Sequence, residues 1–329
     1  MKEFQSSDIR NFALVGHGAS GKTMVSESML SCGGVVNRLG TIINGNTVSD
    51  YHEDERERKI SIHASLLHTE WKNKKFNILD TPGYADFIGE AIGSLRVADF
   101  AAVVVHAGHG VEVGTEQVWE YATNYNIPKM IILNALDKEN LNINEVMEQI
   151  KERFGNKVFA MTLPIKVGPG FNQVVNVLSK KLITYQTDGS GKYSEEDLSG
   201  EWKEKVDLLH EELIELVAES DDSLLEKFFE HGGLSEEEMC TGIHAAVQSE
   251  SVTPLFATSG ETNVGVSHVM DFIAKYGSSP VDRKEVKGIN EKDEETTIAL
   301  DNNEPVAFVF KTMSEPQIGE LSFFRLYSG

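Results

Sequence analysis

The sequence has little of what marks secreted or membrane proteins. Its 329 residues include only two cysteines, Cys32 and Cys240, so a disulfide framework is implausible and a reducing cytoplasm is the expected compartment. No apolar run approaches the ~20 residues that a membrane helix needs. The N-terminal segment MKEFQSSDIRNF has no apolar stretch behind its charges, so we expect neither a signal peptide nor a membrane span.

Basic residues are also scarce. Lys and Arg total 30 against 52 Asp and Glu, which gives a formal charge of −22. Such a chain gains no affinity for DNA or RNA by general neutralisation of phosphates, so any contact with RNA has to be local. We interpret the acidity as a solubility feature, because net charge says little about mechanism.

Buried strands alternate with helices in the first part of the chain. Continuous apolar strands between helices are typical of a parallel sheet covered on both faces, so we predict an α/β fold with a doubly wound, mostly parallel sheet. The expected strands are 11–15, 61–71, 75–80, 100–106, 129–134 and 253–257, and the expected helices are 22–30, 114–125 and one ending near residue 276.

Two later segments break this alternation. Residues 156–252 combine short β-like pieces with three charged amphipathic helices, near 201–219, 222–231 and 235–248, and are predicted to be an inserted α+β subdomain. Residues 277–303 are polar without periodicity and resemble a linker. Residues 304–329 are predicted to form the opening hairpin of a further domain, and we expect the natural protein to continue beyond it. The nucleotide domain would therefore comprise 1–155 and 253–276.

A phosphate-binding loop follows the first strand. The pattern G-x-x-x-x-G-K-[ST] is matched by Gly16, His17, Gly18, Ala19, Ser20, Gly21, Lys22 and Thr23. The glycines let backbone N–H groups surround phosphates, and the start of the following helix adds a positive partial charge. Lys22 would reach the β- and γ-phosphates, and the Thr23 hydroxyl would be a ligand of Mg²⁺.

Further candidates for the metal and the γ-phosphate lie between residues 50 and 83. Asp80 ends a strand and can hold Mg²⁺, directly or through water, while the N–H of Gly83 is free to meet a γ-phosphate. The charged run 50–61 occupies the place of a switch loop that γ-phosphate and metal would order. Ser61 at its end would offer its hydroxyl to the metal.

Two strand ends would bind the base. Asn134 and Asp137 follow the strand KMIILN, and the acceptor pair of Asp137 would meet two donors on guanine, a pattern that adenine lacks. Ser259 and Gly260 follow the strand TPLFA and would supply a backbone contact. Together with the phosphate loop, these positions predict a site for GTP or GDP.

At this point the sequence resembles elongation factor G, a translational GTPase. The resemblance covers essentially the whole chain: NRLGTIINGNTVSDY is similar to the lead-in to that family's switch I, DTPGYADF to its DTPGHVDF, and EELIELVAESDDSLLEKFFE to a helix pair of its inserted subdomain. The segment PVAFVFKTMSEPQIGELSFFRLYSG resembles the start of its β-barrel domain. The resemblance implies a cytoplasmic GTPase, expected to be monomeric, that meets ribosomal stalk proteins and ribosomal RNA during translocation, and that binds neither DNA nor a membrane.

Several positions depart from the family pattern. Ala19 stands where the family has Asp, Lys59 where it has Gly, Ser61 where it has Thr, Tyr84 at the position of its catalytic histidine, and Ala135 in place of the NKxD lysine. Tyrosine, with a pKa near 10, cannot act as a histidine does near neutrality. The sequence therefore predicts an enzyme of the family with weak GTP hydrolysis.

Three alternatives remain open. The protein would be a nucleotide-gated ribosome-binding factor with little hydrolysis, a ribosome-protection or release-type factor, or, from another class, a P-loop kinase or ATPase. Asp137 argues against the last of these.

Overall fold

The computed structural model describes residues 2–289, 292–300, 304–315 and 318–328. Its centre is a seven-stranded sheet of order β2-β3-β1-β4-β5-β11-β6. Neighbouring strands are parallel except for β2 and β3. The strands are β1 (Ile9–Val15), β2 (Ser65–Trp71), β3 (Lys74–Asp80), β4 (Phe100–His106), β5 (Lys129–Asn134), β6 (Val158–Ala160) and β11 (Thr253–Ala257).

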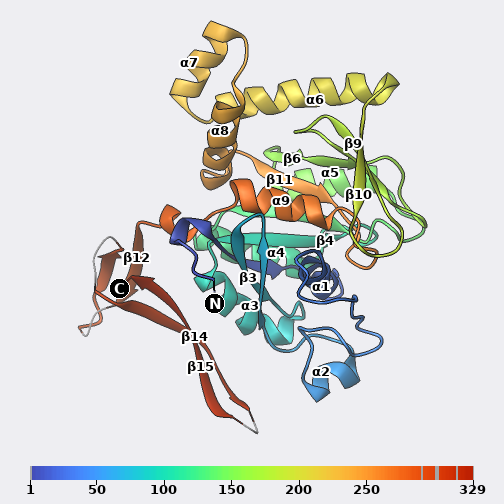
Figure 1. The fold of residues 1–329 in the computed structure, drawn as a ribbon. Coiled ribbons are helices and arrows are strands. Elements are labelled where there is room, and N and C mark those ends of the chain that lie inside the picture. The colour runs from blue at the N-terminus through green and yellow to red at the C-terminus, as the bar shows by residue number, and fades with distance from the viewer. Residues whose placement is uncertain (1, 290–291, 301–303, 316–317, 329) are drawn as a thin grey trace.

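Helices cover both faces of this sheet, as the strand pattern predicts (Figure 1). They are α1 (Lys22–Cys32), α3 (Ile88–Val97), α4 (Val113–Asn124), α5 (Ile143–Phe154) and α9 (Val266–Tyr276). Alternate residues of β1 belong to different cores: Phe12 and Leu14 pack with α1 and α9, whereas Ala13 and Val15 pack with α3 and α4. Burial on both faces explains why the central strands are continuously apolar.

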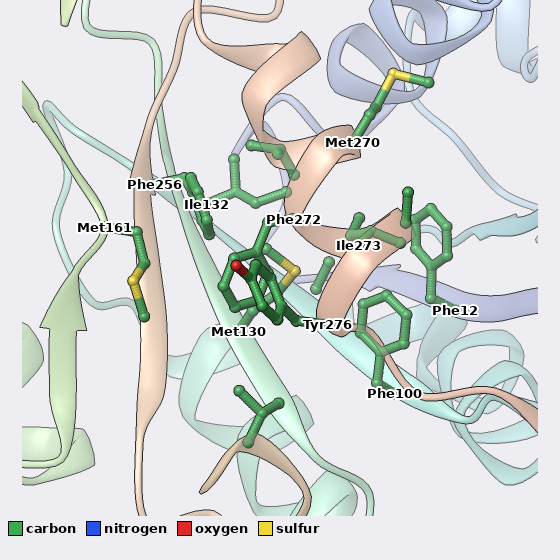
Figure 2. Packing of buried hydrophobic residues seen from close by; sticks show 14 of the residues in the cluster. Phe12, Phe100, Met130, Ile132, Met161, Phe256, Met270, Phe272, Ile273 and Tyr276 are labelled. Carbon is green, nitrogen blue, oxygen red and sulfur yellow. The ribbon is translucent and has the colours of Figure 1, made fainter. Parts of the chain in front are cut away.

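The core beneath α9 is rich in large aromatic residues. Phe12 of β1 stacks on Phe100 of β4 with ring centroids 5.0 Å apart, and Phe256 of β11 meets Phe272 of α9 at 5.1 Å. Figure 2 shows these rings with Met130 of β5 beneath the helix. This packing holds the strands rigidly, so their carboxyl ends are fixed relative to one another.

The carboxyl ends of β1, β3, β4, β5 and β11 share one edge of the sheet. The register pairs Leu14 with Asp80, and His106 with Asn134. The loops that carry the predicted motifs therefore converge there, which is where parallel sheets place ligand sites.

The inserted segment forms a separate antiparallel sheet and three helices. Its sheet has the order β10-β9-β8-β7, with strands β7 (Thr162–Pro164), β8 (Gln173–Asn176), β9 (Lys181–Tyr185) and β10 (Tyr193–Asp197). The predicted helices are found as α6 (Gly200–Ala218), α7 (Asp222–His231) and α8 (Glu236–Gln248), at the top of Figure 1. The range 156–252 also contains β6, which pairs with β11 in the large sheet.

The remaining described segments are mostly β. Residues 277–303, expected to be a linker without regular structure, contain the short helix Pro280–Asp282 and a hairpin of β12 (Glu285–Ile289) with β13 (Glu295–Ala299). Half-burial of alternate side chains favours these strands over coil. Residues 290, 291, 301–303, 316, 317 and 329 of the expected linker and hairpin lie outside the described residues.

The expected hairpin is present as β14 (Val306–Glu315) with β15 (Gly319–Ser328). The predicted fold class is confirmed: a parallel-rich α/β sheet, an inserted α+β unit and a further β-rich region. The proposed domain boundaries, and the barrel that this hairpin would open, stay predictions. Across the described ranges, every helix is too short or too polar to cross a membrane.

Candidate functional site

The phosphate loop runs from β1 to α1 in close contact with its neighbours. A Cβ at Gly16 would lie 2.4 Å from the carbonyl oxygen of Val104, and one at Gly21 would lie 2.2 Å from the side-chain nitrogen of Asn134. Both glycines also have positive φ, 148° and 91°. A side chain at Gly16 would displace the backbone of Val104, and one at Gly21 would displace the amide of Asn134, so the glycine spacing of the motif has a direct structural cause.

Lys22 is buried at the centre of this loop. Its Nζ donates to the carbonyl oxygens of Gly16 at 3.1 Å and His17 at 2.8 Å. Burial lowers the pKa of Lys22 to about 8, against the opposing effect of Asp80 and Asp50. The Lys22 ammonium is thus held at the loop with acidic groups close by. A bound phosphate would compete with the two carbonyl oxygens for it.

The three predicted metal ligands lie next to one another. The Thr23 and Ser61 hydroxyl oxygens are 3.1 Å apart, and the Thr23 hydroxyl lies close enough to the Asp80 carboxyl to oppose the rise of its pKa. The Asp80 carboxylate also accepts a hydrogen bond from Ser26 at 3.0 Å. Asp80 is 1% exposed, and its Oδ1 has no hydrogen-bond partner among the described residues. The structure thus brings Ser61 to Thr23, and the expectation that both hydroxyls bind Mg²⁺ stays a prediction.

A fourth polar group, the Asp50 carboxyl, faces the same place. It is 4% exposed, and within the described residues neither of its carboxylate oxygens has a hydrogen-bond partner. Burial, together with the charge of Asp80, raises the pKa of Asp50 to about 7, and burial raises that of Asp80 as well. Two buried carboxyl groups beside two hydroxyls fit an oxygen-coordinated Mg²⁺. Sequence reasoning missed Asp50, because only its position at the start of the charged run distinguishes it.

The charged run is not a simple solvated loop. Residues Glu53–Arg58 form helix α2, closed at its start by a capping box between His52 and Glu55. Glu55 is 1% exposed and accepts backbone hydrogen bonds from Ile62 at 2.9 Å and His63 at 3.0 Å. Lys59 ends the helix with φ 58° and ψ 36°, the left-handed conformation for which a glycine is better suited. A buried carboxylate therefore fixes the segment that carries Ser61.

Gly83 and Tyr84 close over the phosphate loop. A Cβ at Gly83 would lie 2.3 Å from Lys22 Nζ, and a Cβ at Gly18 would lie 2.9 Å from the ring of Tyr84. The tyrosine ring thus covers Gly18 directly while the side chain stays 41% exposed. Tyr84, which the resemblance aligns with the family's histidine, thus lines the cavity beside the phosphate loop.

Asn134 joins the phosphate loop to the loop that carries Gly260. Its amide nitrogen donates to the Ser20 carbonyl oxygen at 3.0 Å, and its Oδ1 accepts from the Gly260 N–H at 2.8 Å. Asp137 accepts from the Ser259 hydroxyl at 2.7 Å, and Lys138 lies 3.3 Å from its other oxygen. These bonds hold the phosphate loop, the Asn134 loop and the Ser259 loop as one unit.

These loops enclose a cavity of about 250 Å³. Of the predicted site residues, it is lined by Gly18, Ala19, Gly21, Lys22, Thr23, Ser61, Gly83, Tyr84, Asn134 and Asp137. The other predicted residues, Gly16, His17, Ser20, Asp80, Ser259 and Gly260, lie behind this lining. The cavity is also lined by residues that the sequence did not single out as ligands: Met24, Ile42, Lys59, Ile60, His106, Ala135, Lys138 and Glu261.

His17 does not line the cavity because its side chain turns to the start of α4. Its Nε2 lies 3.4 Å from a Glu112 carboxylate oxygen, and its Nδ1 accepts from the Gly114 N–H at 3.3 Å. The backbone of His17, not its ring, is what the site uses, since its carbonyl oxygen accepts from Lys22.

Two comparisons identify the class of protein. A family model described as the elongation factor Tu GTP binding domain matches residues 7–279. The crystal structure of a protein from Thermus thermophilus is similar over 98% of this chain, with 30% sequence identity and a TM-score of 0.86. This chain spans 46% of the length of that one. The expected binding of a guanine nucleotide is thus supported at the level of the family, while the predicted site residues stay a prediction; the chain belongs to the family of the elongation factor Tu GTP-binding domain.

Proposed function

We propose that the protein is a translation factor resembling elongation factor G, which binds GTP and GDP, acts on the ribosome in translocation and hydrolyses GTP slowly. The family match and the linear resemblance of the whole chain support this function. The ribosomal stalk proteins and ribosomal RNA would be its partners, and the cytoplasm its compartment.

The nucleotide would lie along the cavity with its phosphates at Gly18–Lys22 and its base at Asp137. Thr23, Ser61 and Asp80 would hold Mg²⁺, which would neutralise charge on the phosphate oxygens. The buried, unpartnered oxygens of Asp50 and Asp80 support a cation at this place, because uncompensated carboxylates are otherwise costly. The Lys22 ammonium would exchange its two carbonyl partners for phosphate oxygens.

Slow hydrolysis rests on one observation above all: the group next to the phosphate loop is Tyr84, packed against Gly18. A phenol can donate a hydrogen bond to the attacking water, but it cannot share a proton near neutrality as an imidazole does. Ala19 and Ala135 would further weaken contacts to the phosphates and the base. The site therefore fits a protein that holds GTP securely and cleaves it poorly.

The test is multiple-turnover phosphate release by the full-length protein with ribosomes. Tyr84→His should raise the rate between about tenfold and a hundredfold, which is the low end of what a positioned acid or base contributes. Tyr125→His is the matched control, because Tyr125 packs on Arg96 at the far end of α4. A wild-type rate equal to that of a family member with histidine at this position would contradict slow hydrolysis.

The same departures favour a second candidate, a nucleotide-gated ribosome-binding factor with vestigial hydrolysis. A non-hydrolysable GTP analogue would support translation by such a factor but not by one that couples hydrolysis to translocation. A ribosome-protection or release-type role would be distinguished by which step of translation the protein stimulates. Calorimetric titration with GDP and ADP tests the base assignment, and tighter binding of ADP would overturn it.

A further inference from the structure

The base-binding end of the cavity lacks a long side chain at Ala135. This residue directly follows β5, has φ 67° and is 7% exposed, so it offers only a methyl group to the cavity wall. Asp137, two residues later, would recognise the edge of guanine but not its faces. A purine ring bound there needs a flat or apolar surface beside Asp137, because most of the affinity for a base comes from burying its faces.

His106 lies next to this gap. It is the last residue of β4, and its Cα is paired in register with that of Asn134, the residue before Ala135. It lines the same cavity as Ala135 and Asp137. The cavity lining contains two aromatic side chains, His106 and Tyr84. Tyr84 covers Gly18 at the phosphate end.

The His106 ring is held in one orientation by its own loop. Its Nδ1 accepts a hydrogen bond from the Gly108 N–H at 3.0 Å, and the His109 ring stacks on it at 4.2 Å with an interplanar angle of 19°. Burial, then the neighbouring His109 and Lys138, lowers the pKa of His106. The ring is therefore a neutral aromatic surface at pH 7, with its proton on Nε2.

Lys138, the long side chain nearest to Asp137 in the lining, is engaged elsewhere. Its Nζ is bound to the Glu261 carboxylate at 2.5 Å and lies 3.3 Å from Asp137. The lysine would have to give up these ion pairs to cover a base. A preoriented ring loses little conformational entropy when it meets a ligand, which favours His106 over a flexible lysine.

We propose that His106 contacts the guanine base and forms the wall of the base pocket that Ala135 leaves open, which makes it a base-binding residue of this site. The inference rests on the proposed function in so far as the cavity holds a guanine nucleotide. In this arrangement Asp137 selects the edge of the purine, His106 packs against its ring, and His109 supports His106 from behind.

GDP titration of wild type and of His106→Ala, His106→Phe and His68→Ala tests the proposal. His68 is an exposed histidine on β2, away from the cavity, and is the matched control. We expect His106→Ala to weaken GDP binding about tenfold, in the range of one lost base-stacking contact. His106→Phe should stay within about threefold of wild type, because phenyl keeps a flat face, and His68→Ala should not change the affinity.

A double-mutant cycle with Ala135→Lys separates a base contact from a merely structural role. If His106 and a lysine at position 135 pack against the base in the same place, Ala135→Lys restores GDP affinity in the His106→Ala background. In the wild-type background the same substitution then raises GDP affinity much less. Equal gains in both backgrounds, an unchanged affinity in His106→Ala, or an equal loss in His106→Phe and His106→Ala would each overturn the proposal. Failure of the wild type to bind GDP would instead overturn the proposed function itself.

Discussion

Replacement of Glu55 by alanine gives a sharp test of how the switch segment is held. Glu55 is the one buried residue of α2, and its carboxylate accepts hydrogen bonds from the backbone of Ile62 and His63. Its Oε2 also accepts from the His52 N–H at 3.4 Å. A helix of six residues has little other stability, because most helical stability comes from tertiary packing.

The magnitude follows from these bonds. A hydrogen bond to a charged group contributes about 1.5–3 kcal/mol, and Glu55→Ala removes two short ones at a buried position. Water replaces part of these hydrogen bonds when the segment opens. We therefore expect the free energy of local opening to fall by about 3 kcal/mol. This corresponds to roughly a hundredfold larger open population of residues 52–63.

Limited trypsin digestion measures this opening directly. Arg56, Arg58 and Lys59 are exposed but lie in ordered backbone, so their cleavage reports the open fraction when reclosing is fast. Glu57→Ala is the matched control, since Glu57 lies on the same helix and is exposed. Cleavage should be roughly a hundredfold faster in Glu55→Ala and unchanged in Glu57→Ala. In Glu55→Ala, GTP affinity should also fall more than GDP affinity, because Ser61 is no longer held at Thr23. Equal cleavage of the two variants would refute the reasoning.

Three further predictions follow from the same geometry. Lys59→Gly should stabilise the protein by about 0.5–1 kcal/mol in urea unfolding, because glycine adopts the left-handed conformation without strain. Without Mg²⁺, the free energy of unfolding should fall between about pH 4 and 7, because the folded state keeps a proton on Asp50 that the unfolded state loses; the contribution of Asp50 is up to about 4 kcal/mol. Asp50→Asn should make this slope shallower, and the part that remains belongs to Asp80, whose pKa is also raised by burial. Lys311→Met should lower the free energy of local opening of hairpin β14–β15 by about 3 kcal/mol, which hydrogen exchange would detect as faster exchange. The reason is that Lys311 Nζ lies 2.7 Å from the Glu90 carboxylate and 2.8 Å from the Ala64 carbonyl oxygen.

The sequence by itself indicated six of the seven strands of the central sheet, all but β6, and the loop motifs. Strands 100–106 and 129–134 were predicted with the bounds that the structure has, because a continuously apolar run between helices has few other stable arrangements. The glycines of the phosphate loop follow the same logic, since their spacing reflects close backbone approach. The expected guanine nucleotide follows from these local motifs, whereas the family follows from the resemblance of longer segments and from the matching family model.

Tertiary structure alone decided which polar groups become buried and which side chains meet. Glu55 and Glu57 look alike in a charged run, yet one is buried under the switch segment and the other faces solvent. The run itself was expected to be a loop and contains helix α2, because a capping box and tertiary hydrogen bonds outweigh its weak amphipathic pattern. Likewise, the expected linker forms hairpin β12–β13.

The same holds for the parts of the site that have no motif. Asp50 gains its place beside Asp80, and His106 its place beside Ala135, only when the order of the strands is set. Such contacts join residues tens of positions apart, and their energies depend on burial and orientation, which local sequence periodicity does not encode. The sequence thus indicated which loops would bind a guanine nucleotide, whereas the tertiary structure decided which residues would complete the proposed metal site and base pocket.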